Sequence, residues 1–261
     1  MYRNHPFHLV DPSPWPVLTS FSALTMAIGL LVWIHNKVFF LILLSTFFTF
    51  ILAFIWWRDI VRESTYLRFH LLLVQRGLRI RMALFITSEV FFFLRFFWTF
   101  FHSRLATTNE VGYVWPPLGL ETLDPLAVPL LNTVVLLSSR VTVTYSHYSV
   151  VQRMFFDSVI RLVLTLFLRI FFTVLQAMEY ALAPLTISDS VYRSIFFMAT
   201  RFHRFHVIVR SIFLFAALFR IMSRHLIPTQ HVRYECAIWY WHFVDVVWIF
   251  LYISIYWWGS V

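Results

Sequence analysis

Glu89 is the residue of this sequence best placed to do chemistry, because its carboxyl interrupts the apolar run TSEVFFF. Ionisable side chains at bilayer depth are costly and are therefore functional candidates by default. Loss of water favours the neutral, protonated form of a carboxyl. Two interpretations stay open: Glu89 exchanges a proton, or it joins two helices as a hydrogen-bonded carboxyl.

Four further polar residues fall in apolar stretches at a helical spacing of three: His203 with His206, and His242 with Asp245. Histidines on facing helices can bind haem or a metal. No thiolate or Glu-x-x-His pair accompanies them, whereas metal sites require a closed set of ligands. The spacing therefore predicts an intramembrane polar seam between helices, with neither metal nor cofactor in this chain.

A third group, Trp57, Arg62, Glu63 and His70, lies where an apolar stretch ends. Cations and a tryptophan at the membrane boundary can hold a lipid phosphate. An ordinary positively charged loop has the same spacing, so both interpretations stay open. The sequence contains no Gly-rich phosphate loop, nucleophile–base pair or redox motif, and we predict no catalytic residues.

The elements that position these residues are long apolar helices. The 261 residues are 60% hydrophobic and only 13% charged, which excludes a soluble enzyme or binding module. A spanning helix needs about 20 mainly apolar residues. Seven stretches qualify, at about 17–35, 38–57, 80–102, 128–150, 159–182, 194–221 and 237–257.

The sequence therefore predicts an all-α, polytopic membrane protein with a single domain over 1–261. Helices 1 and 2, at about 17–57, form a hairpin around Asn36-Lys37, and helices 3–7 lie at about 80–257. The long charged connection after residue 57 separates the two-helix part from the five-helix part. The single Cys236 excludes an internal disulfide. The net charge of +9 does not indicate nucleic acid, because many of the 20 arginines lie inside apolar runs.

Several long motifs give the chain a family resemblance. They are VDPSPWP (10–16), WWRD (56–59), REST (62–65), FITSEVFFF (85–93), WPP (115–117), VPLLNT (128–133), TVLQA (173–177), WYWHFVDVVW (239–248) and WWGS (257–260). They are spread along the chain, which resembles subunit III of the mitochondrial cytochrome c oxidase over essentially its whole length.

The resemblance implies a seven-helix subunit of the inner mitochondrial membrane, in which two helices lean away from five around a lipid-filled cleft. Such a subunit carries no cofactor of its own and binds structural phospholipids. Its partners are the catalytic subunit, which holds the haem and copper, and the other core and accessory subunits. The implied role is to stabilise the catalytic subunit and to support proton uptake and oxygen access.

Carried onto this sequence, the resemblance implies that lipid is bound by Trp57, Arg62, Glu63, His70 and Arg220. Glu89 matches a buried, carbodiimide-reactive carboxyl near the cleft. The resemblance also implies that His203 and His206 bind no metal. Two alternatives remain: the corresponding subunit of a quinol oxidase, and a proton- or anion-conducting transporter. Repeats with broken helices would favour the transporter, and the sequence shows none.

Ten arginines depart from the pattern, because they stand where family members are expected to have glycine. They are Arg68, Arg81, Arg95, Arg140, Arg169, Arg193, Arg201, Arg204, Arg210 and Arg233. Each arginine at bilayer depth costs about 2.5–3.5 kcal/mol on insertion scales, and no acidic run is near to pair with them.

Some animal mitochondria read the codons AGA and AGG as glycine, whereas the standard code reads them as arginine. We hypothesise that the ten positions are glycines. Glycine would then rise from 5 to 15 residues and the net charge would fall from +9 to −1. The contrary interpretation is that the arginines are real and snorkel or line a water path.

Overall fold

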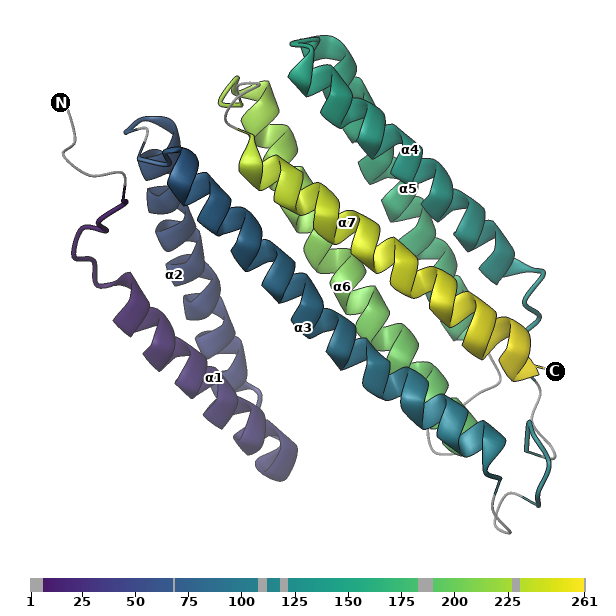
Figure 1. Cartoon of the computed structure of the whole chain (residues 1–261). Helices are drawn as coiled ribbons and strands as arrows, with labels where there is room; N and C mark the ends of the chain where they lie inside the picture. The colour runs from purple at the N-terminus through teal and green to yellow at the C-terminus, as the bar shows by residue number, and fades with distance from the viewer. Residues whose placement is uncertain are drawn as a thin grey trace. The chain divides into compact units, whose positions relative to one another are not determined.

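The computed structural model describes residues 7–67, 69–107, 112–117, 122–182, 190–226 and 231–260. These residues form seven long α-helices and no strand (Figure 1). The helices are α1 (Trp15–Asn36), α2 (Phe40–Thr65), α3 (Leu72–Leu105), α4 (Val128–Val151), α5 (Phe155–Leu182), α6 (Val191–Met222) and α7 (Val232–Leu251). A π-helical turn (Tyr252–Trp257) and a 3-10 turn (Trp258–Ser260) follow α7.

All seven α-helices are long and apolar enough to cross a membrane. The predicted all-helical, seven-span architecture is therefore confirmed for the described residues. A helix satisfies its own backbone hydrogen bonds, which is why apolar sequences of this length form helices in lipid.

The helix boundaries differ from the predicted ones mainly around the charged segment after residue 57. There α2 continues to Thr65 and α3 already begins at Leu72, whereas the sequence predicted a connection from 58 to 79. Hydropathy identifies only the part of a helix that lies within the hydrocarbon core of the membrane. Beyond that core, water can solvate charged side chains while the helical hydrogen bonds continue.

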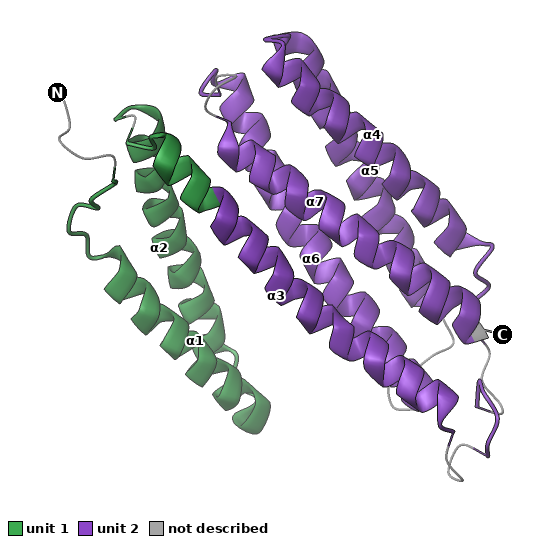
Figure 2. Ribbon diagram, viewed as in Figure 1, with its two compact units in different colours: residues 1–78 green, residues 79–261 purple. Residues whose placement is uncertain are grey.

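Contacts divide the chain into two compact units, residues 1–78 and 79–261 (Figure 2). In the first unit, α1 and α2 form the predicted hairpin. Its turn requires a left-handed residue, Lys37 (φ 59°), whose backbone N–H donates to Trp33 O at 2.9 Å. The two helices approach closely at Gly29, where an added Cβ would lie 2.9 Å from the backbone N of Ile42. Small residues at helix contacts are typical of membrane bundles.

The second unit packs around buried aromatic side chains. α4 packs against α5, α6 packs against both α5 and α7, and α7 also contacts α4. Trp248 and Phe172 are fully buried with their ring centroids 5.1 Å apart. Phe93 and Phe100 of α3 belong to the same core. Residues of α3, α5, α6 and α7 are therefore brought together inside one unit.

Candidate functional site

Glu89 of α3 pairs with His206 of α6 inside the second unit. Glu89 Oε2 lies 2.6 Å from His206 Nε2, and the two side chains are 19% and 8% exposed. His206 also places its other ring nitrogen, Nδ1, 2.7 Å from the carbonyl oxygen of Phe202. One carboxyl and one imidazole thus form the polar contact between these helices.

The backbone contact of His206 decides how the pair carries its proton. A carbonyl oxygen only accepts hydrogen bonds, so Nδ1 must be the donor to Phe202 O. Nε2 then either accepts a proton from a protonated Glu89 or, in an imidazolium, donates to its carboxylate. In both forms one proton lies between the two side chains and the pair has no net charge. Without that proton, two acceptors would face each other at 2.6 Å.

Aromatic rings surround the imidazole of His206. The ring centroids of Phe93, Phe92 and Tyr240 lie 5.0, 6.0 and 6.4 Å from that of His206. Low polarity strengthens a satisfied hydrogen bond and penalises an unpaired polar group. The surroundings therefore favour keeping the Glu89–His206 pair intact.

Asp245 of α7 lies between two buried arginines. Its Oδ1 accepts from Arg210 Nη1 of α6 at 2.7 Å and from Arg169 Nη2 of α5 at 3.2 Å. Arg210 Nη1 also donates to Trp241 O at 2.6 Å. Arg210 thus has one acidic partner, although no acidic run stands near it in the sequence. Sequence distance hid the partner, because Asp245 comes from the next helix.

This buried cluster is nevertheless poorly compensated. Arg169 and Arg210 are only 2% and 0% exposed, and a single carboxylate faces both. Among the described residues, the Nε and Nη1 of Arg169 and the Nε and Nη2 of Arg210 have no hydrogen-bond partner. Both guanidiniums lie over the ring of Trp241, at 4.3 and 4.5 Å. Two cations with unpaired donors are expensive to bury.

The other arginines in question have varied surroundings. Arg201 lies over Phe197 at 5.0 Å and Arg204 over Tyr180 at 5.9 Å. Arg68 lies outside the described residues. The remaining five sort by burial: Arg193 is buried, Arg233 is half-buried, and Arg81, Arg95 and Arg140 are exposed on their helices.

The predicted polar seam is divided among different contacts. His203 is fully buried, and its Nε2 donates to Val244 O of α7 at 3.2 Å. His206 instead joins α6 to α3, and Asp245 binds the two arginines. His242 is half-buried, and its Nδ1 has no hydrogen-bond partner among the described residues. No group of three or more His, Cys, Asp or Glu in the described ranges is arranged to hold a metal ion.

The boundary residues of the first unit gather at the end of α2. Glu63 Oε2 lies 3.5 Å from His8 Nε2, and the rings of His8 and His70 are 5.5 Å apart. Trp57 is 60% exposed, and Arg62 is also exposed. Sequence reasoning missed His8, which stands far from the group along the chain. Arg220 belongs to the last turn of α6, in the second unit.

Sequence reasoning also missed a second buried carboxyl, Glu179 of α5. Gln176 Nε2 donates to Glu179 Oε2 at 3.1 Å and to the hydroxyl oxygen of Tyr256 at 3.2 Å. All three side chains are buried. The spacing of three between Gln176 and Glu179, next to the TVLQA motif, was a signal that could have found the pair.

Comparisons with known proteins agree with the motifs. The sequence profile described as "Cytochrome c oxidase subunit III" matches residues 5–260. "Cytochrome c oxidase subunit 3" of Danio rerio is 54% identical over 259 residues, covering 99% of both chains. The protein of that name from Pisaster ochraceus is 52% identical over 260 residues, covering 100% of both, and that from Aedes aegypti is 51% identical over 259 residues, covering 99% of both. This chain therefore belongs to the cytochrome c oxidase subunit III family.

Proposed function

We propose that this chain is a core subunit of the respiratory terminal oxidase, which transfers electrons from cytochrome c to oxygen, and that it has no active site of its own. The observation that carries the proposal is the similarity along the entire length, at 51–54% identity with coverage of 99–100% on both sides. Its partners are then the haem- and copper-bearing catalytic subunit and the other subunits of the complex. Its task is to stabilise the catalytic subunit during turnover.

The location of the protein follows from the family and the helices. The relatives are animal proteins of the mitochondrial oxidase family, and this chain has seven helices able to span a membrane. The prediction of a multi-pass protein of the inner mitochondrial membrane is therefore confirmed.

Lipid binding is the second part of the proposal. In it, α1 and α2 diverge from the other five helices around a lipid-filled cleft. Trp57, Arg62, Glu63 and His70 hold a phospholipid headgroup together with Arg220. The exposure of Trp57 and Arg62 supports this assignment, because both side chains are available to a ligand. A tryptophan and cations at the membrane boundary suit a phosphate.

Glu89 has the third role, as a proton-exchanging carboxyl that supports proton uptake by the catalytic subunit. Its pairing with His206 supports this role, because the pair keeps a transferable proton without net charge in apolar surroundings. The interpretation as a purely structural tie predicts the same contact, so function has to be measured.

Purification of the oxidase from inner membranes tests the proposal. We expect this chain in a one-to-one ratio with the catalytic subunit. Removing it is expected to leave the haems in place and the initial oxygen consumption nearly unchanged, while activity is lost faster during turnover. Absence of the chain from the complex, or loss of haem on its removal, would contradict the proposal.

Two controls address the remaining alternatives. This subunit does not select the electron donor, so its own properties cannot identify a quinol oxidase. The donor that the purified complex oxidises makes that distinction. A transporter is distinguished by reconstituting the purified chain in liposomes. Proton or anion flux through those liposomes would favour the transporter, whereas we expect none.

A further inference from the structure

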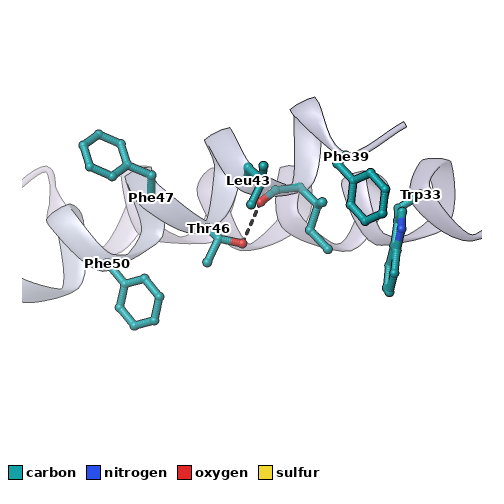
Figure 3. A pocket seen from close by; sticks show the side chains of 7 residues that line it. Trp33, Phe39, Leu43, Thr46, Phe47 and Phe50 are labelled. Atoms are coloured by element: carbon teal, nitrogen blue, oxygen red, sulfur yellow. Dashed lines mark hydrogen bonds between the residues drawn. The ribbon is translucent and has the colours of Figure 1, made fainter. Parts of the chain in front are cut away.

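The hairpin of α1 and α2 carries an apolar groove on the first unit. Its volume is about 460 Å³, and Figure 3 shows the side chains around it. The lining residues are Trp33, Phe39, Ile42, Leu43, Thr46, Phe47 and Phe50. The only hydroxyl among them, on Thr46, donates to Ile42 O at 2.6 Å. A hydrocarbon chain suits these walls better than a ligand that needs hydrogen bonds.

The length of the groove matches one leaflet of a bilayer. Its residues on this side run from Phe39, the residue that precedes α2, to Phe50. At about 1.5 Å per residue this segment covers about 16 Å. The hydrocarbon core of a bilayer is about 30 Å thick. A chain lying along α2 from the turn would therefore end near the middle of the membrane, as an acyl chain does.

The end of the groove at the turn is positively charged. Lys37, the only lysine of the sequence, lies exposed in the turn between Trp33 and Phe39, whose ring centroids are 5.4 Å apart. Residues 31–50 contain no acidic side chain that could neutralise it. A lysine at the interface attracts an anionic headgroup while the groove receives the chain.

We propose that this groove binds an anionic phospholipid of the leaflet at the α1–α2 turn. One acyl chain lies along the groove, and the phosphate pairs with Lys37. The site is separate from the Trp57 group, which lies at the other end of α2, so it does not depend on the lipid site proposed above. The same hairpin would then hold lipid in both leaflets.

Photolabelling of the intact oxidase complex tests this site. The complex is reconstituted in nanodiscs with phosphatidylglycerol that carries a diazirine in the middle of one acyl chain, or with phosphatidylcholine that carries the same chain. We expect phosphatidylglycerol to label residues 42–50 several-fold more than phosphatidylcholine does. Labelling of Phe54, whose side chain is 70% exposed on the same helix, should be equal for the two lipids and serves as the internal control.

Two variants of Lys37 distinguish the effect of its charge from an effect on the folding of the turn. Lys37→Gln should reduce phosphatidylglycerol labelling of the groove to the phosphatidylcholine level, whereas Lys37→Arg should retain it. Both substitutions meet the same positive φ of 59°, so they carry a similar backbone cost. Equal labelling by both lipids, or labelling that Lys37→Gln leaves unchanged, would overturn the proposal. Absence of label from residues 42–50 with either lipid, while Phe54 is labelled, would overturn the proposal too and would show that protein covers the groove instead.

Discussion

Glu89 and His206 lie 2.6 Å apart although 117 positions of sequence separate them. The backbone carbonyl of Phe202 fixes the imidazole so that Nε2 faces the carboxyl. One proton is therefore held between α3 and α6, in a pair that is neutral in either of its forms. The structure thereby gives Glu89 a polar partner that the sequence does not show.

Glu89→Gln is expected to abolish labelling of this chain by a hydrophobic carbodiimide, because the reagent requires a carboxyl. The amide can still hydrogen-bond with His206, so assembly and oxygen reduction should remain nearly intact. Peptide mapping of the labelled complex makes the measurement. Glu179→Gln, at the other buried carboxyl, is the control that should leave labelling of Glu89 in place. Loss of haem in Glu89→Gln would contradict an assignment without an active site.

His206→Leu is expected to destabilise the second unit by about 1–3 kcal/mol, because it leaves the Glu89 carboxyl without its partner. His102→Leu, at an exposed position of α3, should change stability by no more than about 0.5 kcal/mol. Thermal unfolding of the complex compares the two. The double variant Glu89→Leu/His206→Leu should cost less than the sum of the single variants. Strict additivity would show that the pair contributes nothing.

Gly29→Ala is expected to push α1 and α2 apart, because its Cβ would meet the Ile42 backbone at 2.9 Å. Overpacking of this kind costs about 1–3 kcal/mol. Gly77→Ala is the matched control, since nothing lies within 4 Å of the added Cβ there and alanine favours helix α3. Protease sensitivity of the hairpin in the complex is the measurement. Equal sensitivity of the two variants would disprove the close contact.

Mass spectrometry of peptides covering residues 200–211 decides the identity of the anomalous arginines. We expect glycine at positions 201, 204 and 210. Trypsin, which cleaves after arginine, would then leave this segment uncut. Arg210 supports the expectation, because two of its nitrogens find no partner in the described part of the chain and a cation buried in this way is costly. Arginine at all three positions would make the Asp245 cluster a genuine feature of the membrane interior.

Asp245→Asn provides a thermodynamic test of the same question. If positions 169 and 210 are arginine, the substitution removes the carboxylate that faces both cations and should cost about 3–5 kcal/mol. If they are glycine, the amide replaces an unpaired carboxyl and the cost should be small. We expect the small effect, measured as the change in thermal stability of the complex.

The helical fold could be predicted residue by residue with little error in the apolar segments. α4 begins at Val128 as predicted and ends within a residue of the predicted end. The sequence did not predict the charged C-terminal end of α2 or the start of α3. Charged residues beyond the hydrocarbon core lower the local hydropathy although the backbone there is still helical. The family could be assigned because its motifs, such as WYWHFVDVVW, are contiguous in sequence.

The partners of the site residues could not be predicted in the same way. His8 approaches Glu63, Asp245 approaches Arg210, and Gln176 reaches Tyr256 across helix boundaries. Each contact depends on how two segments that are separate in the sequence are placed against each other. Spacing within one helix, which placed His203 and His206 on adjacent turns, carries no information about the helix they face.

The seven membrane-spanning helices can be read from the sequence alone, because membrane insertion is decided by the local transfer of each segment from water to lipid. The family can be read from it as well, because the motifs are contiguous. The pairing of Glu89 with His206, and the position of Asp245 beside two guanidiniums, depend instead on how the helices pack. The physical reason is that short-range hydrogen bonds and ion pairs form only after the helices have packed and brought distant side chains to within about 3 Å.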